Sequence, residues 1–170
     1  GCVALSDMTA LSNKDLSSVT SMELCFNNCR FTNVDFLAGV NPTSLTDVTA
    51  MLRNCILLQN VDGLSGWASH ITAMAEMCMN CRSLVDLTGL ANLDVSAVTE
   101  MRSVFEDCVK LRSLDGLENL DTGNVTTFYR MFCNDHWISD ISAMNSWNFG
   151  SATNTAEMFS GISALTDLSN

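Results

Sequence analysis

The chain has 170 residues, of which 47% are hydrophobic and 16% charged, and its formal net charge at pH 7 is −11. This hydrophobic content excludes a disordered chain, and eight Lys and Arg residues in all provide no basic face for nucleic acid. No apolar run is long enough to span a bilayer, and no charged leader with an apolar core opens the chain. We therefore expect a well-packed acidic protein with no nucleic-acid partner.

Cysteine, or a residue in its place, returns every 26 or 27 residues along the chain. Self-similarity at such a period is typical of stacked repeat units, each of which buries its apolar face against its neighbours. We therefore expect a single elongated domain over 1–170, with about six to seven coils, that starts and ends within a repeat. The column consists of Cys2, Cys29, Cys55, Cys81, Cys108, Asp135 and Ile162.

Each repeat predicts a helix followed by a short strand. In the repeat 97–117, apolar residues at 98, 101, 104, 105, 108 and 111 recur three or four apart, which places them on one helix face. In the following Ser113-Leu114-Asp115, the leucine points inward and its neighbours outward. A polar turn then leads to the next repeat. In chain order, equivalent segments begin at Val19, Ser44, His70, Ala97, Asn124 and close to Thr153.

The run Val-Thr-x-Met-x-x-x-Phe-x-x-Cys-x-x-Leu-x-x-Leu at 98–114 resembles the BspA-type leucine-rich repeats of bacterial surface proteins, and the resemblance covers the whole chain. Typical members carry Trp-Asp in the turn, where this chain has Trp67 and Trp147 but Leu93 and Leu120 in other copies. The resemblance implies an α/β fold, a right-handed leucine-rich repeat solenoid with strands on the concave side and helices on the convex side. It also implies export to the cell surface and adhesion to a protein or glycan, but no catalytic site.

The eight cysteines do not predict a disulfide framework. Five of them belong to one apolar column, in which isoleucine at Ile162 replaces cysteine, so buried reduced thiols are expected there. Cys78 and Cys81 form a Cys-x-x-Cys pair, but no second pair of ligands lies at matching spacing, and structural zinc usually takes four ligands. A metal or thiol site at Cys78 and Cys81 is therefore kept as a lesser alternative, and no cofactor or metal is expected.

Every predicted strand carries one aspartate and one neutral polar residue at its two outward positions. Because neighbouring strands lie about 4.8 Å apart, these aspartates would form a row that favours cationic partners or divalent ions. A second interpretation is that Asp, Asn, Ser and Thr bond to the backbone of the following turn, and both interpretations remain open. The aspartates are Asp7, Asp35, Asp62, Asp86, Asp115, Asp140 and Asp167.

A second candidate surface consists of Tyr129, His136 and Trp137, which with Cys133 would share one helix face. Aromatic residues that point outward are common in recognition surfaces, although a neighbouring turn covering Trp137 is an equally good explanation. Enzyme activity is not expected, because His70 and His136 are the only histidines and stacked repeats rarely bring a nucleophile and a base together.

Three functions are therefore considered. The first is an extracellular or cell-surface module that binds a protein or glycan ligand through the strand face. The second is a spacer that projects another domain, and the third is the metal or thiol site. Since neither terminal repeat resembles a capping unit, we also expect further repeats in a longer parent protein or end-to-end self-association.

Overall fold

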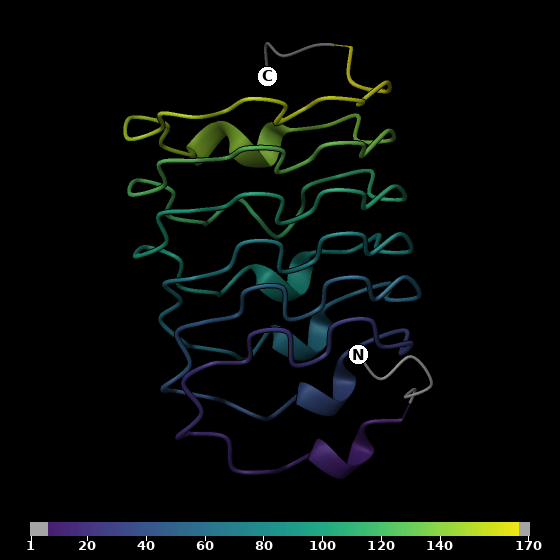
Figure 1. Ribbon diagram of the computed structural model, residues 1–170, viewed down its shortest axis with the longest axis vertical. Coiled ribbons are helices and arrows are strands. Elements are labelled where there is room, and N and C mark those ends of the chain that lie inside the picture. Colours follow the sequence, from purple (N-terminus) through teal and green to yellow (C-terminus); the bar gives the residue numbers. More distant parts are fainter. Residues whose placement is uncertain (1–6, 167–170) are drawn as a thin grey trace.

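The structure, a computed structural model, describes residues 7–166 of the chain. Successive turns of the chain are stacked along one long axis (Figure 1). Parallel bridges join Ser21 to Asp47 and Asp47 to Ala73, and the first of these pairs is 26 residues apart. The spacing of the sequence repeat is therefore the length of one coil.

The regular elements in the described residues are five short 3-10 helices, and strands longer than single bridges are absent there. They are η1 (Thr9–Leu11), η2 (Asp35–Leu37), η3 (Asp62–Leu64), η4 (Thr88–Leu90) and η5 (Ser142–Ser146). Each of η1, η2 and η3 contacts the next one along the stack. The segments that the sequence predicts as strands thus run directly into these 3-10 turns.

The half of each coil that the sequence predicts as a helix is instead a series of turns. In an α-helix each N–H donates to the carbonyl four residues earlier. Here the N–H groups of Met101, Ser103 and Phe105 donate to the following coil, over N···O distances of 2.9, 2.9 and 3.0 Å. We call these the inter-coil hydrogen bonds. Equivalent bonds recur in other coils. Their donors are the N–H groups of residues 22, 24, 26 and 28 in one coil, of 48, 50, 52 and 54 in the next, of 76, 78 and 80 in the third, and of 128, 130, 132 and 134 in a later coil.

Two residues per coil, four positions apart, have left-handed backbone conformations, and these explain why the helix does not form. In one coil they are Ser103 (φ 54°) and Asp107 (φ 63°). A left-handed residue interrupts a right-handed helix, and Asn and Asp tolerate this conformation better than other residues with a Cβ. The second position accordingly holds Asn28, Asn54, Asn80, Asp107 and Asn134.

Side chains reinforce the stacking at two positions per coil. Asn80 Nδ2 donates to Asn54 Oδ1 at 2.7 Å, and Asn134 Nδ2 donates to Asp107 Oδ1 at 3.0 Å. Elsewhere in the coil, threonine hydroxyls donate to the carbonyl of the equivalent threonine in the preceding coil. These bonds link Thr46 to Thr20, Thr72 to Thr46, Thr126 to Thr99 and Thr153 to Thr126, at 3.0–3.3 Å.

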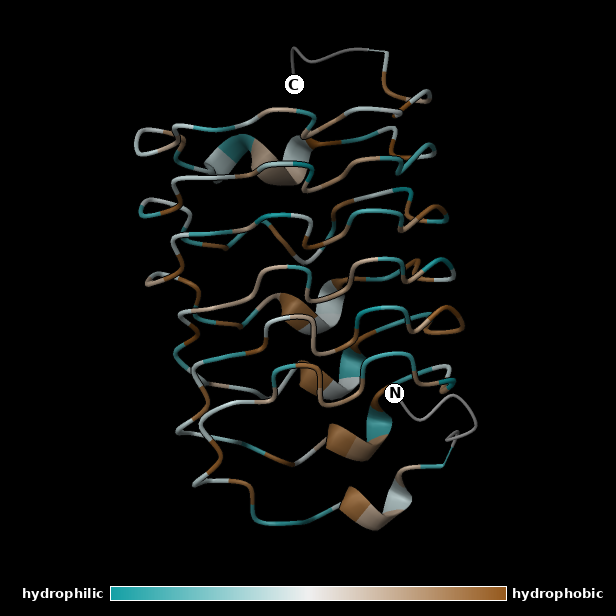
Figure 2. Cartoon of the chain, in the orientation of Figure 1, coloured by the Kyte–Doolittle hydropathy of each residue, from teal (hydrophilic) through white to brown (hydrophobic). Residues whose placement is uncertain are grey.

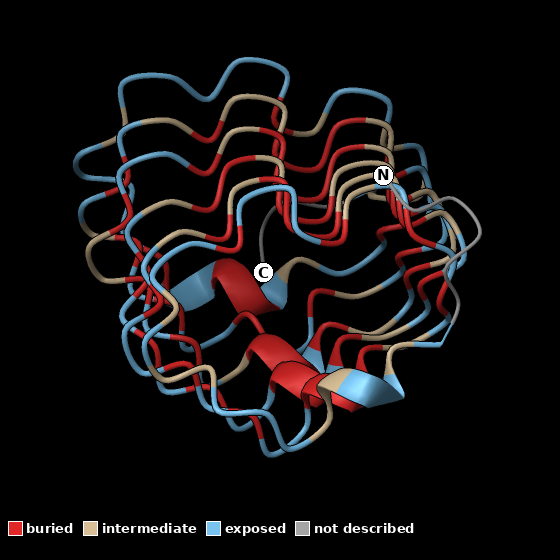
Figure 3. Cartoon of the chain, turned by 60° about the horizontal axis from the view of Figure 1, so that its bottom comes forward, coloured by how far each residue is buried: buried red, intermediate tan, exposed pale blue. Residues whose placement is uncertain are grey.

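The apolar positions of the repeat form the core, whatever the backbone conformation. Val98, Met101 and Phe105 are at most 1% exposed, and in a view turned toward the end of the stack the buried segments line the inside of the coils (Figure 3). Hydrophobic and hydrophilic stretches alternate along the coils (Figure 2). A turn every four residues thus selects the same inward positions as one face of a helix.

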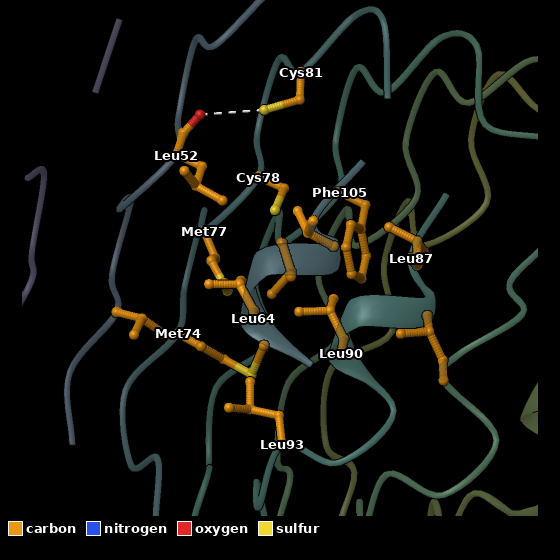
Figure 4. Packing of buried hydrophobic residues seen from close by; sticks show 14 of the residues in the cluster. Leu52, Leu64, Met74, Met77, Cys78, Cys81, Leu87, Leu90, Leu93 and Phe105 are labelled. Atoms are coloured by element: carbon orange, nitrogen blue, oxygen red, sulfur yellow. Dashed lines mark hydrogen bonds between the residues drawn. The ribbon is translucent and has the colours of Figure 1, made fainter. Parts of the chain in front are cut away.

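The cysteine column lies in this core, and its thiols have a polar role. Cys81 Sγ donates to the carbonyl of Leu52 at 3.2 Å (Figure 4), and Cys55 Sγ and Cys108 Sγ donate to the preceding coil at 3.1 and 3.3 Å. Burial raises the pKa of each of these three thiols, which keeps them protonated and able to donate. The column thus combines apolar packing with a weak donor.

The close approach of η3 and η4 to the preceding coil requires glycine. A Cβ added to Gly63 in η3 would lie 2.0 Å from the carbonyl oxygen of Val34, and one added to Gly89 in η4 would lie 2.0 Å from that of Val61. These distances are far below van der Waals contact. The Asp-Gly-Leu and Thr-Gly-Leu runs of the repeat are therefore set by the approach of one coil to the next.

Asp135 takes the place of cysteine in the column and is fully buried. Among the described residues, neither of its carboxyl oxygens has a hydrogen-bond partner. Burial raises the pKa of Asp135 to about 9, and the nearby backbone amide of Cys108 offsets only part of that rise. At neutral pH the side chain is therefore a protonated acid in an apolar site.

Replacing Asp135 with cysteine should stabilise the chain at neutral pH but not in acid. The folded chain holds the Asp135 proton more tightly than the unfolded chain does. The contribution of this proton to the stability of the native chain is therefore fully present below about pH 4, and it is lost as the pH rises toward 9. The free energy of unfolding of Asp135→Cys, relative to that of the native chain, should therefore rise with pH, by up to about 4 kcal/mol from about pH 4 to pH 7. Urea unfolding across this pH range measures the difference, with the exposed Asp62→Asn as the control. A pH-independent difference would contradict the assignment.

The left-handed conformation of Asn80 predicts that glycine is a better replacement than alanine. Both changes remove the bond to Asn54, but alanine also suffers a steric cost at φ 61°. Asn80→Ala should therefore lower the free energy of unfolding by about 1 kcal/mol more than Asn80→Gly. Chemical denaturation of the two variants measures this difference in the free energy of unfolding. If alanine were the less destabilising replacement, as in a helix interior, the left-handed assignment would be wrong.

Candidate functional site

The predicted aspartate row divides into two columns with different surroundings. In the first column, the carboxylate accepts hydrogen bonds from the backbone two residues later. Asp86 Oδ1 accepts from Thr88 N at 2.8 Å and from Thr88 Oγ1 at 2.7 Å, and Asp140 Oδ1 accepts from Ser142 N at 2.8 Å. Asp7 makes the same bonds with Thr9, and Asn33 and Asn60 replace aspartate in their coils.

These bonds have the geometry of turn caps at the start of the 3-10 turns. The backbone bonds of Thr9 and Ser142 lower the pKa of Asp7 and Asp140. The capping interpretation therefore accounts for the first column of the row.

The second column holds Asp35, Asp62 and Asp115, which are exposed and accept no hydrogen bond from another described residue. Val61 and Leu114, which precede Asp62 and Asp115, are buried at 0% and 1% exposure, so these aspartates face outward. Asp167 lies outside the described residues. Three carboxylates of the predicted row are thus available to a ligand in the part of the chain that the structure describes.

The aromatic patch is only partly assembled. Trp137 is 57% exposed, and its ring faces the guanidinium of Arg112, with Cζ 5.7 Å from the ring centroid. His136 is exposed and holds the carbonyl of Gly161 through Nδ1, at 2.6 Å. Tyr129 is half-buried and makes no ring contact with Trp137. The helix face that would have joined the three residues does not form.

A surface beside the aspartate row has a composition that sequence reasoning missed. It consists of the four residues that follow each member of the cysteine column, and none of them is Asp or Glu in any described coil. We call it the acid-free strip. It comprises residues 30–33, 56–59, 82–85, 109–112, 136–139 and 163–166. Four of the eight Lys and Arg residues of the chain lie in it: Arg30, Arg82, Lys110 and Arg112.

The cations of the strip differ from the other arginines in their partners. Arg53 and Arg102 share Glu76, and Arg130 contacts Glu106 and Glu157. Among the described residues, none of the four strip cations forms an ion pair; the nearest polar partner of Arg82 is Asn80 Oδ1, at 2.7 Å. Their charge therefore remains available in a chain with a net charge of −11.

Backbone hydrogen bonds hold the strip together across coils. Gln59 N donates to Thr32 O at 2.8 Å, Val85 N to Gln59 O at 2.9 Å and Ser139 N to Arg112 O at 3.2 Å. The residues between these outward positions are buried, including Leu58, Leu84 and Leu111. The strip is thus a surface of side chains on a backbone whose own donors and acceptors face neighbouring coils.

Large apolar side chains are exposed on the same strip. Leu57, Val85 and Trp137 account for three of the five large hydrophobic residues that are exposed among those described. Val85, Lys110, Arg112 and Trp137 line a cleft of about 370 Å³. The sequence carried a signal for this site, namely the absence of acidic residues at the same four positions of every repeat.

The other candidate chemistries have little support in the geometry. Cys78 and Cys81 are both fully buried, and within 7–166 no three His, Cys, Asp or Glu side chains form a group that could hold a metal ion. His70 Nδ1 lies 2.6 Å from Asp94 Oδ2, and Ser96 Oγ donates to Asp94 Oδ1 at 2.7 Å, so the serine hydroxyl is bonded to the carboxylate and not to the histidine. No helix in the described part of the chain is long and apolar enough to cross a membrane.

The two columns of the aspartate row predict different responses to mutation. Asp86→Ala removes both bonds to Thr88 and should lower the free energy of unfolding by about 1 kcal/mol. The matched change Asp62→Ala removes an exposed carboxylate that accepts no bond, and should stay within about 0.5 kcal/mol of the native chain. Thermal unfolding of the two variants measures this contrast. Equal losses would contradict the division into capping and free carboxylates.

Comparison with known proteins gives one family and no named relative. Residues 4–86 and 72–170 match the family described as "Mycoplasma protein of unknown function, DUF285". No curated protein and no solved structure matches the chain. The two matched segments together cover nearly all of it, which is consistent with the resemblance to BspA-type repeat proteins. The chain therefore belongs to the DUF285 family, whose function is unknown.

Proposed function

We propose that the chain is a binding module of the cell surface, which recognises a protein or glycan through the outward face formed by the acid-free strip and the exposed aspartates beside it. The observation that carries the proposal is the strip itself, where unpaired cations and exposed apolar side chains lie together. Exposed apolar side chains that form a contiguous surface commonly mark interaction sites. The leucine-rich repeat class, export and adhesion are part of the same proposal and follow from the family resemblance.

Three features support the use of this face rather than another. Its backbone is fixed by inter-coil contacts at Gln59, Val85 and Ser139, so its side chains are pre-organised for a ligand. The ion-paired side of the coils neutralises its own charges through Glu76 and Glu106. Trp and Arg, the residue types that contribute most to binding energy at interfaces, meet on the strip at Trp137 and Arg112.

The aspartates of the second column give the face a second charge sign. Asp62 and Asp115 are exposed and belong to the same outward stretches as Gln59 and Arg112. A ligand that spans several coils would therefore meet cations on the strip and carboxylates beside it. This charge pattern favours specific recognition over non-specific binding, because a partner whose charges are arranged differently meets like charges on this face.

Charge reversal on the strip should abolish binding on a glycan and protein array. Lys110→Glu combined with Arg112→Glu reverses two adjacent cations, while the control Lys14→Glu reverses an exposed cation outside the strip. The double variant should lose at least tenfold in signal for any ligand of the native chain, and the control should keep it. Circular dichroism of each variant verifies folding.

The array also separates the module from a spacer that projects another domain. A native chain that binds nothing on either array would favour the spacer and contradict the proposal. Binding that survives the double variant but is lost in Asp62→Lys with Asp115→Lys would move the site from the strip to the aspartates.

A further inference from the structure

A cleft at Trp137 lies within the acid-free strip. Its lining residues come from three successive coils: Val85, then Lys110 and Arg112, then Trp137. Its volume of about 370 Å³ falls within the range of small-molecule sites, roughly 300–1,000 Å³. Two of its four lining residues are cations and none is acidic, so the cleft is complementary to a small anion that also has apolar surface.

The Arg112 guanidinium lies over the Trp137 ring. It stacks at 5.7 Å from the Trp137 ring centroid, and it has no carboxylate partner among the described residues. A planar guanidinium without a carboxylate partner is well suited to bind a carboxylate through two parallel hydrogen bonds. Lys110 adds a second positive charge to the same cleft, and the exposed part of the indole offers a flat apolar surface.

The geometry of the cleft argues against an extended peptide. Peptides that bind to sheet-like surfaces usually pair with a free backbone edge, whereas Val85 N and Ser139 N are already bonded to neighbouring coils. The cleft also spans only two inter-coil steps, about 10 Å in all. That length suits one or two sugar rings, whose carbon–hydrogen faces pack on aromatic rings while their substituents remain polar.

We infer that this cleft binds a carboxylate-bearing saccharide, such as one with a sialic or uronic acid. The inference rests on the proposed function, and it names the ligand class of the same face. The sugar ring packs on the part of the Trp137 ring that Arg112 leaves exposed. Its carboxylate accepts hydrogen bonds from the Arg112 guanidinium and lies near the Lys110 ammonium, while Val85 contacts the apolar edge of the ring.

Isothermal titration calorimetry with four probes tests this inference on the full chain. Sialyllactose and trigalacturonic acid carry carboxylates, lactose is a neutral saccharide and a hexaglutamate peptide is an acidic non-saccharide. We expect at least one of the two acidic saccharides to bind, and neither lactose nor the peptide. Trp137→Ala and Arg112→Gln should each raise Kd at least tenfold, and Trp137→Phe should retain most of the affinity.

Lys14→Gln is the matched control, because it changes the net charge as Arg112→Gln does but lies outside the strip. Failure of both acidic saccharides to bind, equal binding of lactose, binding of the peptide alone, or full affinity in the Trp137→Ala and Arg112→Gln variants would each overturn the inference. If an array ligand depends on Lys110 and Arg112 while both acidic saccharides fail, the proposed function stands and only the ligand class is wrong. If the native chain also binds nothing on the arrays, both the proposed function and the ligand class are wrong.

Discussion

The hydrogen bonds between successive coils are the interaction on which the rest of this structure depends. Each coil directs N–H groups such as those of Cys78 and Asn80 at carbonyls of the next coil, and this is achieved without regular strands. Left-handed residues such as Glu76 and Asn80 make it achievable, because they redirect the chain every four residues. A helix would satisfy the same groups within one coil and would remove these bonds between coils.

The register set by these bonds determines what the surface presents. Because each coil repeats the previous one with a shift of 26 or 27 residues, equivalent side chains remain on the same face of the stack. Because Asp and Glu are absent from the same four positions in each repeat, the side chains at these positions together form a continuous surface without acidic residues. The strip gathers cations and apolar side chains, whereas the arginines Arg53, Arg102 and Arg130, outside the strip, form ion pairs with glutamates.

The sequence predicts the repeat, the core and the outward positions, but not the backbone conformation. Val98, Met101 and Phe105 are buried as predicted, because a turn every four residues and a helix bury the same spacing. The Asn or Asp that precedes each column residue from Cys29 to Asp135 was the available signal for left-handed turns. The cleft could not be predicted, since it depends on how Arg112 and Trp137 meet across two coils.

The inter-coil hydrogen bonds can be tested most directly by measuring nuclear magnetic resonance couplings across hydrogen bonds in the native chain. We predict a coupling between the amide nitrogen of Cys78 and the carbonyl carbon of Val104, because Cys78 N lies 2.9 Å from Val104 O. A coupling from Cys78 to the carbonyl of Met74 instead, four residues earlier as in an α-helix, would contradict it.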